Sequence, residues 1–76
     1  SPITAFPRAK AATLRALEIE PNLVEAHISL GICLMNYDWN WQGAELSFQK
    51  AIELNDNYAE AHQVYATFLM RIGRVT

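Results

Sequence analysis

The sequence has few of the residues that mark secreted, membrane-spanning or nucleic-acid-binding chains. Its single cysteine, Cys33, excludes an internal disulfide framework and is typical of a reducing compartment, which predicts a cytoplasmic protein. The six Lys and Arg residues are scattered and the formal net charge is −2, so no basic patch for phosphate is present. No apolar run approaches the roughly 20 residues that a spanning helix needs. We therefore expect neither nucleic acid nor a membrane as a partner.

Groupings of residues that carry out chemistry are also missing. The sequence has no glycine-rich phosphate loop, no Ser-His-Asp grouping and no close pair of carboxylates. His27, His62 and Cys33 are the best metal ligands by type, but six positions separate His27 from Cys33, which places them on different sides of a helix. Packing is the favoured role for both histidines. We expect no catalytic residue, no metal, no cofactor and no enzyme activity, with a metal or thiol enzyme as a residual alternative.

What the sequence does contain is enough apolar material for one small folded domain. Of its 76 residues, 51% are hydrophobic and 18% are charged, which is too apolar for a disordered chain. A domain of this size buries only about 60% of the surface of its unfolded chain, so its stability is marginal. Both ends resemble cuts, and we expect a segment excised from a longer protein.

An internal repeat is the strongest pattern. Shifting the sequence by 35 positions aligns residues 16–27 with residues 51–62, and half of the twelve pairs are identical. A period of this length is typical of stacked helical units. Pro21 and Gly73 read as helix stops, because proline cannot continue a helix and glycine favours its C-terminal turn. Helices are expected at residues 7–19, 23–36, 41–54 and 58–72.

The pattern also predicts how two of these helices begin and how they pack. Asn22 and Asn57 stand three residues before Glu25 and Glu60, an arrangement related to the capping box. Gly31 is expected to allow a close approach of two helix backbones, since glycine otherwise costs about 1 kcal/mol in a helix interior. Two apolar faces at helical spacing are predicted to pack together: His27, Leu30, Gly31 and Leu34 on one helix, and Trp41, Ala44, Phe48, Ala51 and Ile52 on the next.

These residues resemble the tetratricopeptide repeat, whose pattern is Trp-x-x-Leu-Gly-x-x-Tyr, then Ala-x-x-x-Phe, Ala and Pro. Leu30-Gly31, Ala44, Phe48 and Ala51 fit the pattern, and Pro21 fits its closing proline. Several positions depart from it, and the period is one residue longer than the usual 34, which we assign to the turn at residues 37–41. The departures are histidine for Trp at His27 and His62, leucine for Tyr at Leu34 and Leu69, and Asp56 for Pro.

The resemblance implies an all-α, right-handed solenoid of antiparallel helix hairpins with about four helices. Residues 1–22 would be the second helix of a preceding repeat, residues 23–57 one complete repeat, and residues 58–76 the first helix of a following repeat. The chain is also similar to repeat arrays attached to bacterial signalling and regulatory proteins.

The family's function implies a protein or peptide partner, held in a groove lined by the first helix of each unit. Candidate peptide-binding residues are Glu25, Ile28, Ser29, Ile32, Met35, Asn36, Glu60, Gln63, Thr67, Met70 and Arg71. An alternative for Ile28, Ile32 and Met35 is packing against the first helix of a preceding unit. A carboxylate clamp is disfavoured, because Arg71 is the one cation on this face.

Two further alternatives stay open. The chain is either a recognition module or a structural spacer or oligomerisation segment, and a homo-oligomer through uncapped terminal helices is expected. Trp41 is predicted to enter the hairpin core. Trp39 is either a lid over that core or an exposed anchor for a partner, with the lid favoured.

Overall fold

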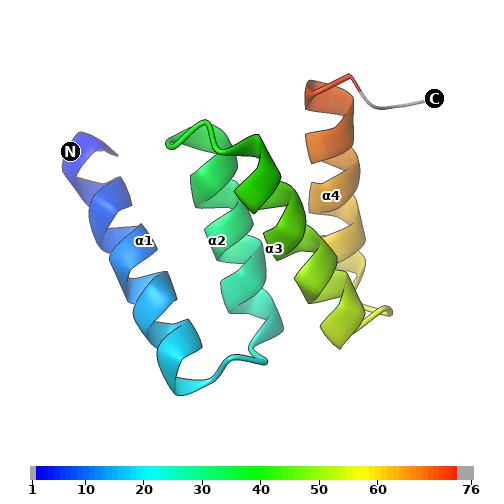
Figure 1. Ribbon diagram of the computed structural model, residues 1–76, viewed down its shortest axis with the longest axis horizontal. Helices are drawn as coiled ribbons and strands as arrows, with labels where there is room; N and C mark the ends of the chain where they lie inside the picture. The colour runs from blue at the N-terminus through cyan, green and yellow to red at the C-terminus, as the bar shows by residue number, and fades with distance from the viewer. Residues whose placement is uncertain (1, 74–76) are drawn as a thin grey trace.

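Four helices lying side by side make up the fold (Figure 1). The computed structural model describes residues 2–73, and side chains from Arg8 onward. Consecutive helices run in opposite directions, which confirms the all-α class and the helical-repeat segment of antiparallel hairpins. Residues 1 and 74–76 of the predicted units lie outside the described residues, and the division into three units stays a prediction. The helices are α1 (Pro2–Ile19), α2 (Val24–Asn36), α3 (Trp41–Leu54) and α4 (Ala59–Arg71).

The helix ends agree with the sequence except at the start of α1. The first helix was predicted to begin at residue 7, whereas α1 begins at Pro2 and runs through Pro7. A proline this close to a helix start removes a single hydrogen bond, and the helix continues. At the other end of the fold Gly73 has a φ of +75°, which confirms it as the stop of α4.

The predicted asparagine caps of α2 and α4 are wrong. Leu23 and Tyr58 hold the N-cap positions without a side-chain cap. The Asn22 and Asn57 side chains make no cap because both residues belong to the preceding turn: the Asn22 N–H donates to Glu20 Oε1 at 3.2 Å, and the equivalent bond of Asn57 is 3.1 Å long.

The histidines instead fasten these two turns. His27 Nε2 donates to the Pro21 carbonyl at 2.7 Å, and His62 Nε2 donates to the Asp56 carbonyl at 2.6 Å. Because a carbonyl oxygen only accepts, Nε2 carries a hydrogen in both rings. The repeated histidine thus has a hydrogen-bonding role where packing was predicted, and it holds each loop against the helix that follows.

The core lies where α2, α3 and α4 meet. The predicted face of α3 is confirmed: Ala44, Phe48 and Ala51 have no exposed area, and Trp41 and Ile52 pack on them half-buried. Phe48 and Phe68 contact each other with ring centroids 5.6 Å apart.

The buried face of α2 consists of other residues than the predicted ones. Gly31 is buried, but His27, Leu30 and Leu34 are only half-buried, and Ile28 and Met35 are buried in their place. The prediction assumed that α2 buries a single apolar stripe against one neighbour, whereas α2 contacts three helices. Ile28, Ile32 and Met35 belong to the clusters built with α3 of their own predicted unit and with α4 of the next one, so they pack on these two helices.

Candidate functional site

A hydrogen bond joins α2 and α4 at their C-terminal ends. Arg71 Nη1 donates to Asn36 Oδ1 at 2.6 Å. The two residues are 35 positions apart, so they occupy equivalent places in the repeat. Both were predicted site residues, and the structure brings them together.

The predicted site residues separate by burial into two groups. Ile28 and Met35 are buried and Ile32 is half-buried in the core, so these three do not form an open groove. The exposed members are Glu25, Ser29, Glu60, Gln63, Thr67, Met70 and Arg71, while Asn36 is half-buried.

The register of the helices assigns the exposed members to two surfaces. We call the first the α2/α4 face and define it by Glu25, Ser29, Asn36, Glu60, Thr67 and Arg71. The second, the outer face of α4, consists of Ala59, His62, Gln63, Ala66 and Met70. Gln63 and Met70 lie on this second surface, apart from the other exposed members of the predicted peptide site.

Carboxylates gather at the other end of the α2/α4 face. Burial raises the pKa of Tyr58, and the charges of Glu25 and Glu60 together with a hydrogen bond to Glu25 raise it further. Both carboxylates therefore lie near one phenol, although they belong to different helices. Tyr58 was not among the predicted site residues, and in the structure it holds the N-cap position of α4.

The α2/α4 face has the dimensions of a short peptide. Glu25 and Asn36 are eleven positions apart, which is about 16 Å along a helix. An extended peptide covers that distance with about five residues. Hydroxyl, amide, carboxylate and guanidinium groups lie along it, and Arg71 keeps donors beyond the one given to Asn36. The arrangement suits hydrogen bonding to a peptide backbone and its side chains.

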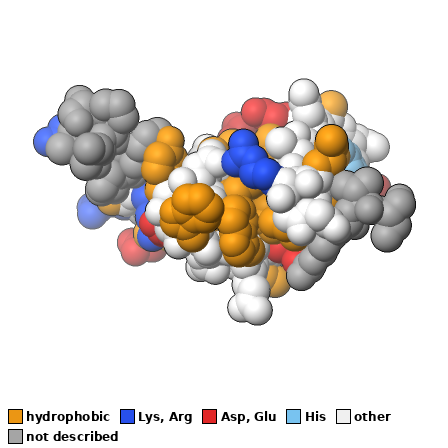
Figure 2. All heavy atoms as spheres, turned by 90° about the horizontal axis from the view of Figure 1, so that it is seen from above, with side chains coloured by type: hydrophobic (Ala, Val, Ile, Leu, Met, Phe, Trp, Pro, Cys, Tyr) orange, Lys and Arg blue, Asp and Glu red, His pale blue; other side chains and the backbone are white. Residues whose placement is uncertain are grey.

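The loop between α2 and α3 presents a tryptophan to solvent. Trp39 is 71% exposed, so the predicted lid is wrong and the alternative of an exposed position holds. Its φ is +53°, an unusual value for a bulky residue. The Trp39 ring stands edge-on to Trp41 at 5.7 Å between centroids. Figure 2 shows hydrophobic side chains gathered on the end of the molecule where this loop lies.

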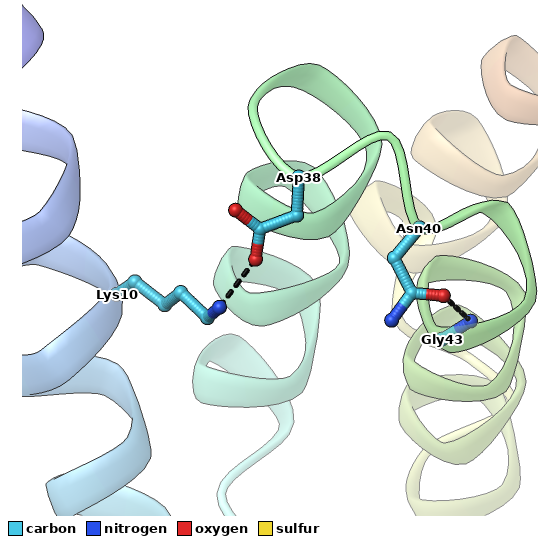
Figure 3. Close-up of polar contacts among 4 residues, drawn as sticks. All are labelled: Lys10, Asp38, Asn40 and Gly43. Carbon is cyan, nitrogen blue, oxygen red and sulfur yellow. Dashed lines mark hydrogen bonds and ion pairs between the residues drawn. The ribbon is translucent and has the colours of Figure 1, made fainter.

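Polar contacts on both sides hold this loop in place (Figure 3). Lys10 of α1 forms an ion pair with Asp38, and the Asn40 side chain accepts from the Gly43 N–H at 2.9 Å as the N-cap of α3. The Asn40 N–H also donates to the Leu34 carbonyl at 2.9 Å. The exposed tryptophan is therefore carried on a well-anchored turn.

A shallow hollow of about 490 Å³ lies over α2 and α3. Leu46, which is exposed, forms part of its wall. The lining residues are His27, Leu30, Leu46, Ser47, Gln49, Lys50 and Glu53. Its walls carry no grouping of catalytic side chains, so the hollow adds no candidate chemistry.

The structure adds nothing in favour of a metal or a reactive thiol. Within the described part of the chain, no three His, Cys, Asp or Glu side chains come together as a metal site. Burial raises the pKa of the Cys33 thiol, Asp38 raises it further, and Lys10 lowers it. A buried thiol with a raised pKa stays protonated and unreactive near neutral pH.

Comparison with known proteins gives one partial match. No protein-family model and no solved structure matches the chain. Over 54 residues, or 71% of its length, the chain is 41% identical to Protein O-mannosyl-transferase Tmtc2 of Drosophila melanogaster, and it spans 6% of that protein. Tmtc2 is a tetratricopeptide-repeat protein, so the match supports a tetratricopeptide-like repeat segment. None of the helices in residues 2–73 combines the length and apolar character needed to cross a membrane.

Proposed function

We propose that the chain is a protein-interaction module that holds a peptide segment of a partner along the α2/α4 face. The observation that carries the proposal is the hydrogen bond between Asn36 and Arg71, which ties equivalent positions of two repeat units into one surface. A surface shared by α2 and α4 suits a peptide that lies along them, because such a ligand can contact side chains of two successive units at once.

The charges on this face favour one direction of the bound peptide. Glu25 and Glu60 lie at the N-terminal ends of α2 and α4, and Arg71 lies at the C-terminal end. A peptide with a basic group at one end and an acidic group at the other fits this distribution.

We also propose that the chain is cytoplasmic and has no catalytic activity of its own. The absence of a catalytic grouping in the sequence supports the second statement, and the single cysteine supports the first. The transferase activity in the name of the fly protein belongs to that protein, of which this chain spans 6%.

A random-peptide display selection on the immobilised chain tests the proposal. Enriched peptides should bind the Arg71→Ala variant about tenfold more weakly, since a hydrogen bond to a charged group contributes about 1.5–3 kcal/mol. Arg15→Ala is the matched control, because Arg15 is an exposed arginine on α1, away from the face. No enrichment over the bare support, or equal binding by both variants, contradicts the proposal.

The second candidate is a spacer or oligomerisation segment of a multidomain bacterial signalling protein. The exposed outer face of α4 is the observation in its favour. The matched relative is a fly protein, so the comparison does not support a bacterial signalling protein as the source of this segment.

A further inference from the structure

The hydrogen bond between Asn36 and Arg71 fixes the orientation of the Asn36 amide. Arg71 Nη1 lies 2.6 Å from Asn36 Oδ1. A guanidinium group only donates hydrogen bonds, so the atom of Asn36 that it approaches must be the amide oxygen. The amide nitrogen, which carries the N–H groups, is not part of this bond. The one acceptor atom of the two side chains is thus engaged, and their remaining polar groups are all N–H donors.

These donors form a cationic end of the α2/α4 face. Arg71 stays protonated at any physiological pH, and it gives only one of its several N–H groups to Asn36. Arg71 is exposed and Asn36 is half-buried, so a ligand on this face can reach both side chains. An end of the face that offers positive charge and N–H groups requires an anionic acceptor from its ligand.

A carboxylate has the geometry that this pair of side chains requires. It is planar, and its two oxygens accept two hydrogen bonds side by side, which is how a guanidinium group binds it most strongly. Here the Asn36 amide adds a further donor beside the guanidinium group. A neutral amide in the ligand would present one oxygen and one NH₂ group, and that NH₂ group would meet further donors. The pair therefore favours Asp or Glu over Asn or Gln.

Two negative charges close to the pair do not outweigh this preference. Asn36 and Arg71 lie at the C-terminal ends of α2 and α4, where the helix dipole disfavours an anion by about two- to fivefold in affinity. A hydrogen bond to a charged group favours it by about tenfold or more. The nearest carboxylate in the sequence, Asp38, forms an ion pair with Lys10 (Figure 3), so its charge is largely compensated.

We propose that Asn36 and Arg71 together bind a carboxylate group of the peptide, with one oxygen accepting from the Arg71 guanidinium group and the other from the Asn36 amide nitrogen. The inference rests on the peptide binding proposed above and specifies the chemical group that the peptide carries at this end of the α2/α4 face. Both residues belong to helices of this chain, so the site is formed without α1 or the outer face of α4.

Changes in the peptide give the first test. The probes are the peptides enriched by the display selection, synthesised with an amidated C-terminus and with each Asp or Glu replaced in turn by Asn or Gln. One replacement should weaken binding about tenfold or more. If instead a free C-terminus strengthens binding by that factor, the group is the terminal carboxylate. If neither change matters, this inference is overturned while peptide binding stands, and a selection without enriched peptides overturns both.

The substitution Asn36→Asp separates ligand binding from a purely structural role of Asn36. Aspartate keeps an oxygen that accepts from Arg71 but replaces the amide nitrogen by a second oxygen. If Asn36 only tied α2 to α4, the variant would bind the peptide as well as the unchanged chain does. We expect binding to weaken about tenfold or more. Unchanged binding overturns the proposal. Asn22→Asp is the matched control, because this exposed turn residue undergoes the same change of charge away from Arg71.

Side-chain NMR signals show the contact directly. The Asn36 amide NH₂ and Arg71 guanidinium signals should shift when the carboxylate peptide is added, and should shift much less with its Asn or Gln counterpart. Circular dichroism of each variant shows that it is folded. An Asn36 NH₂ signal that stays in place while the carboxylate peptide binds would overturn the proposed role of Asn36.

Discussion

The substitution Gly31→Ala tests the close packing of α2 on α3. The new Cβ would lie 2.5, 2.8 and 2.9 Å from three atoms of the Phe48 ring, all well inside van der Waals contact. The ring is fully buried, so either it or the helix must shift. Overpacking of this kind lowers the free energy of unfolding by about 1–3 kcal/mol. Replacing glycine by alanine in a helix interior raises it by about 1 kcal/mol.

The expected net loss for Gly31→Ala is about 1–2 kcal/mol, taking the upper part of the overpacking range because three ring atoms are involved. For a domain of this size, each 1 kcal/mol lowers the melting temperature by about 4–8 °C. Gly31→Leu should lower the free energy of unfolding clearly more than Gly31→Ala, because three further carbons must be accommodated beside the Phe48 ring.

Thermal and urea unfolding followed by far-UV circular dichroism measure this loss. Phe48→Leu in the Gly31→Ala background should recover part of the overpacking cost, which separates crowding from a general effect on the helix. Ala66→Gly is a useful comparison, since the equivalent exposed position in α4 should show only the helix propensity of about 1 kcal/mol. A higher melting temperature for Gly31→Ala would refute the close α2–α3 contact.

Three further changes test other parts of the structure. Trp39→Gly should raise the free energy of unfolding by about 1 kcal/mol, because glycine adopts the φ of +53° without steric cost; a lower melting temperature would contradict this. Asn40→Ala removes the cap that accepts from the Gly43 N–H and should cost about 1 kcal/mol in chemical unfolding, whereas an unchanged midpoint would show that the cap is dispensable. Burial raises the pKa of the Cys33 thiol, so the stability that the protonated thiol contributes is complete below the unfolded pKa of about 8.5 and is lost as the pH rises through the folded pKa. In urea unfolding at increasing pH, Cys33→Ala should therefore lose less stability above that pH than the unchanged chain. Identical pH profiles of the two proteins would contradict this contribution of Cys33.

The sequence predicts the helices well because each has a clear period and a clear stop. The face of α3 was also predictable, since it packs mainly to one side and Ala44, Phe48 and Ala51 all point there. The face of α2 was not, because a helix with three neighbours has no single stripe to read. The predicted asparagine caps were wrong because Asn22 and Asn57 lie in the turn, one residue before the observed N-cap.

The candidate site was predictable only in part. Helical spacing placed Asn36 and Arg71 on one face, and the repeat offset made them equivalent, yet their hydrogen bond depends on how α2 and α4 pack. Burial of Ile28 and Met35 follows from the same packing, which no local pattern encodes. The exposure of Trp39 depends on a backbone conformation that a bulky residue rarely adopts.

Mapping a selected peptide onto the chain by NMR chemical shifts tests the central claim most directly. The claim is that this repeat segment recognises a peptide along the α2/α4 face. It predicts that the largest amide shifts fall on Ser29, Asn36, Thr67 and Arg71, with α1 and the outer side of α3 unchanged. Shifts confined to the hollow over α2 and α3, or to the loop at Trp39, would contradict it.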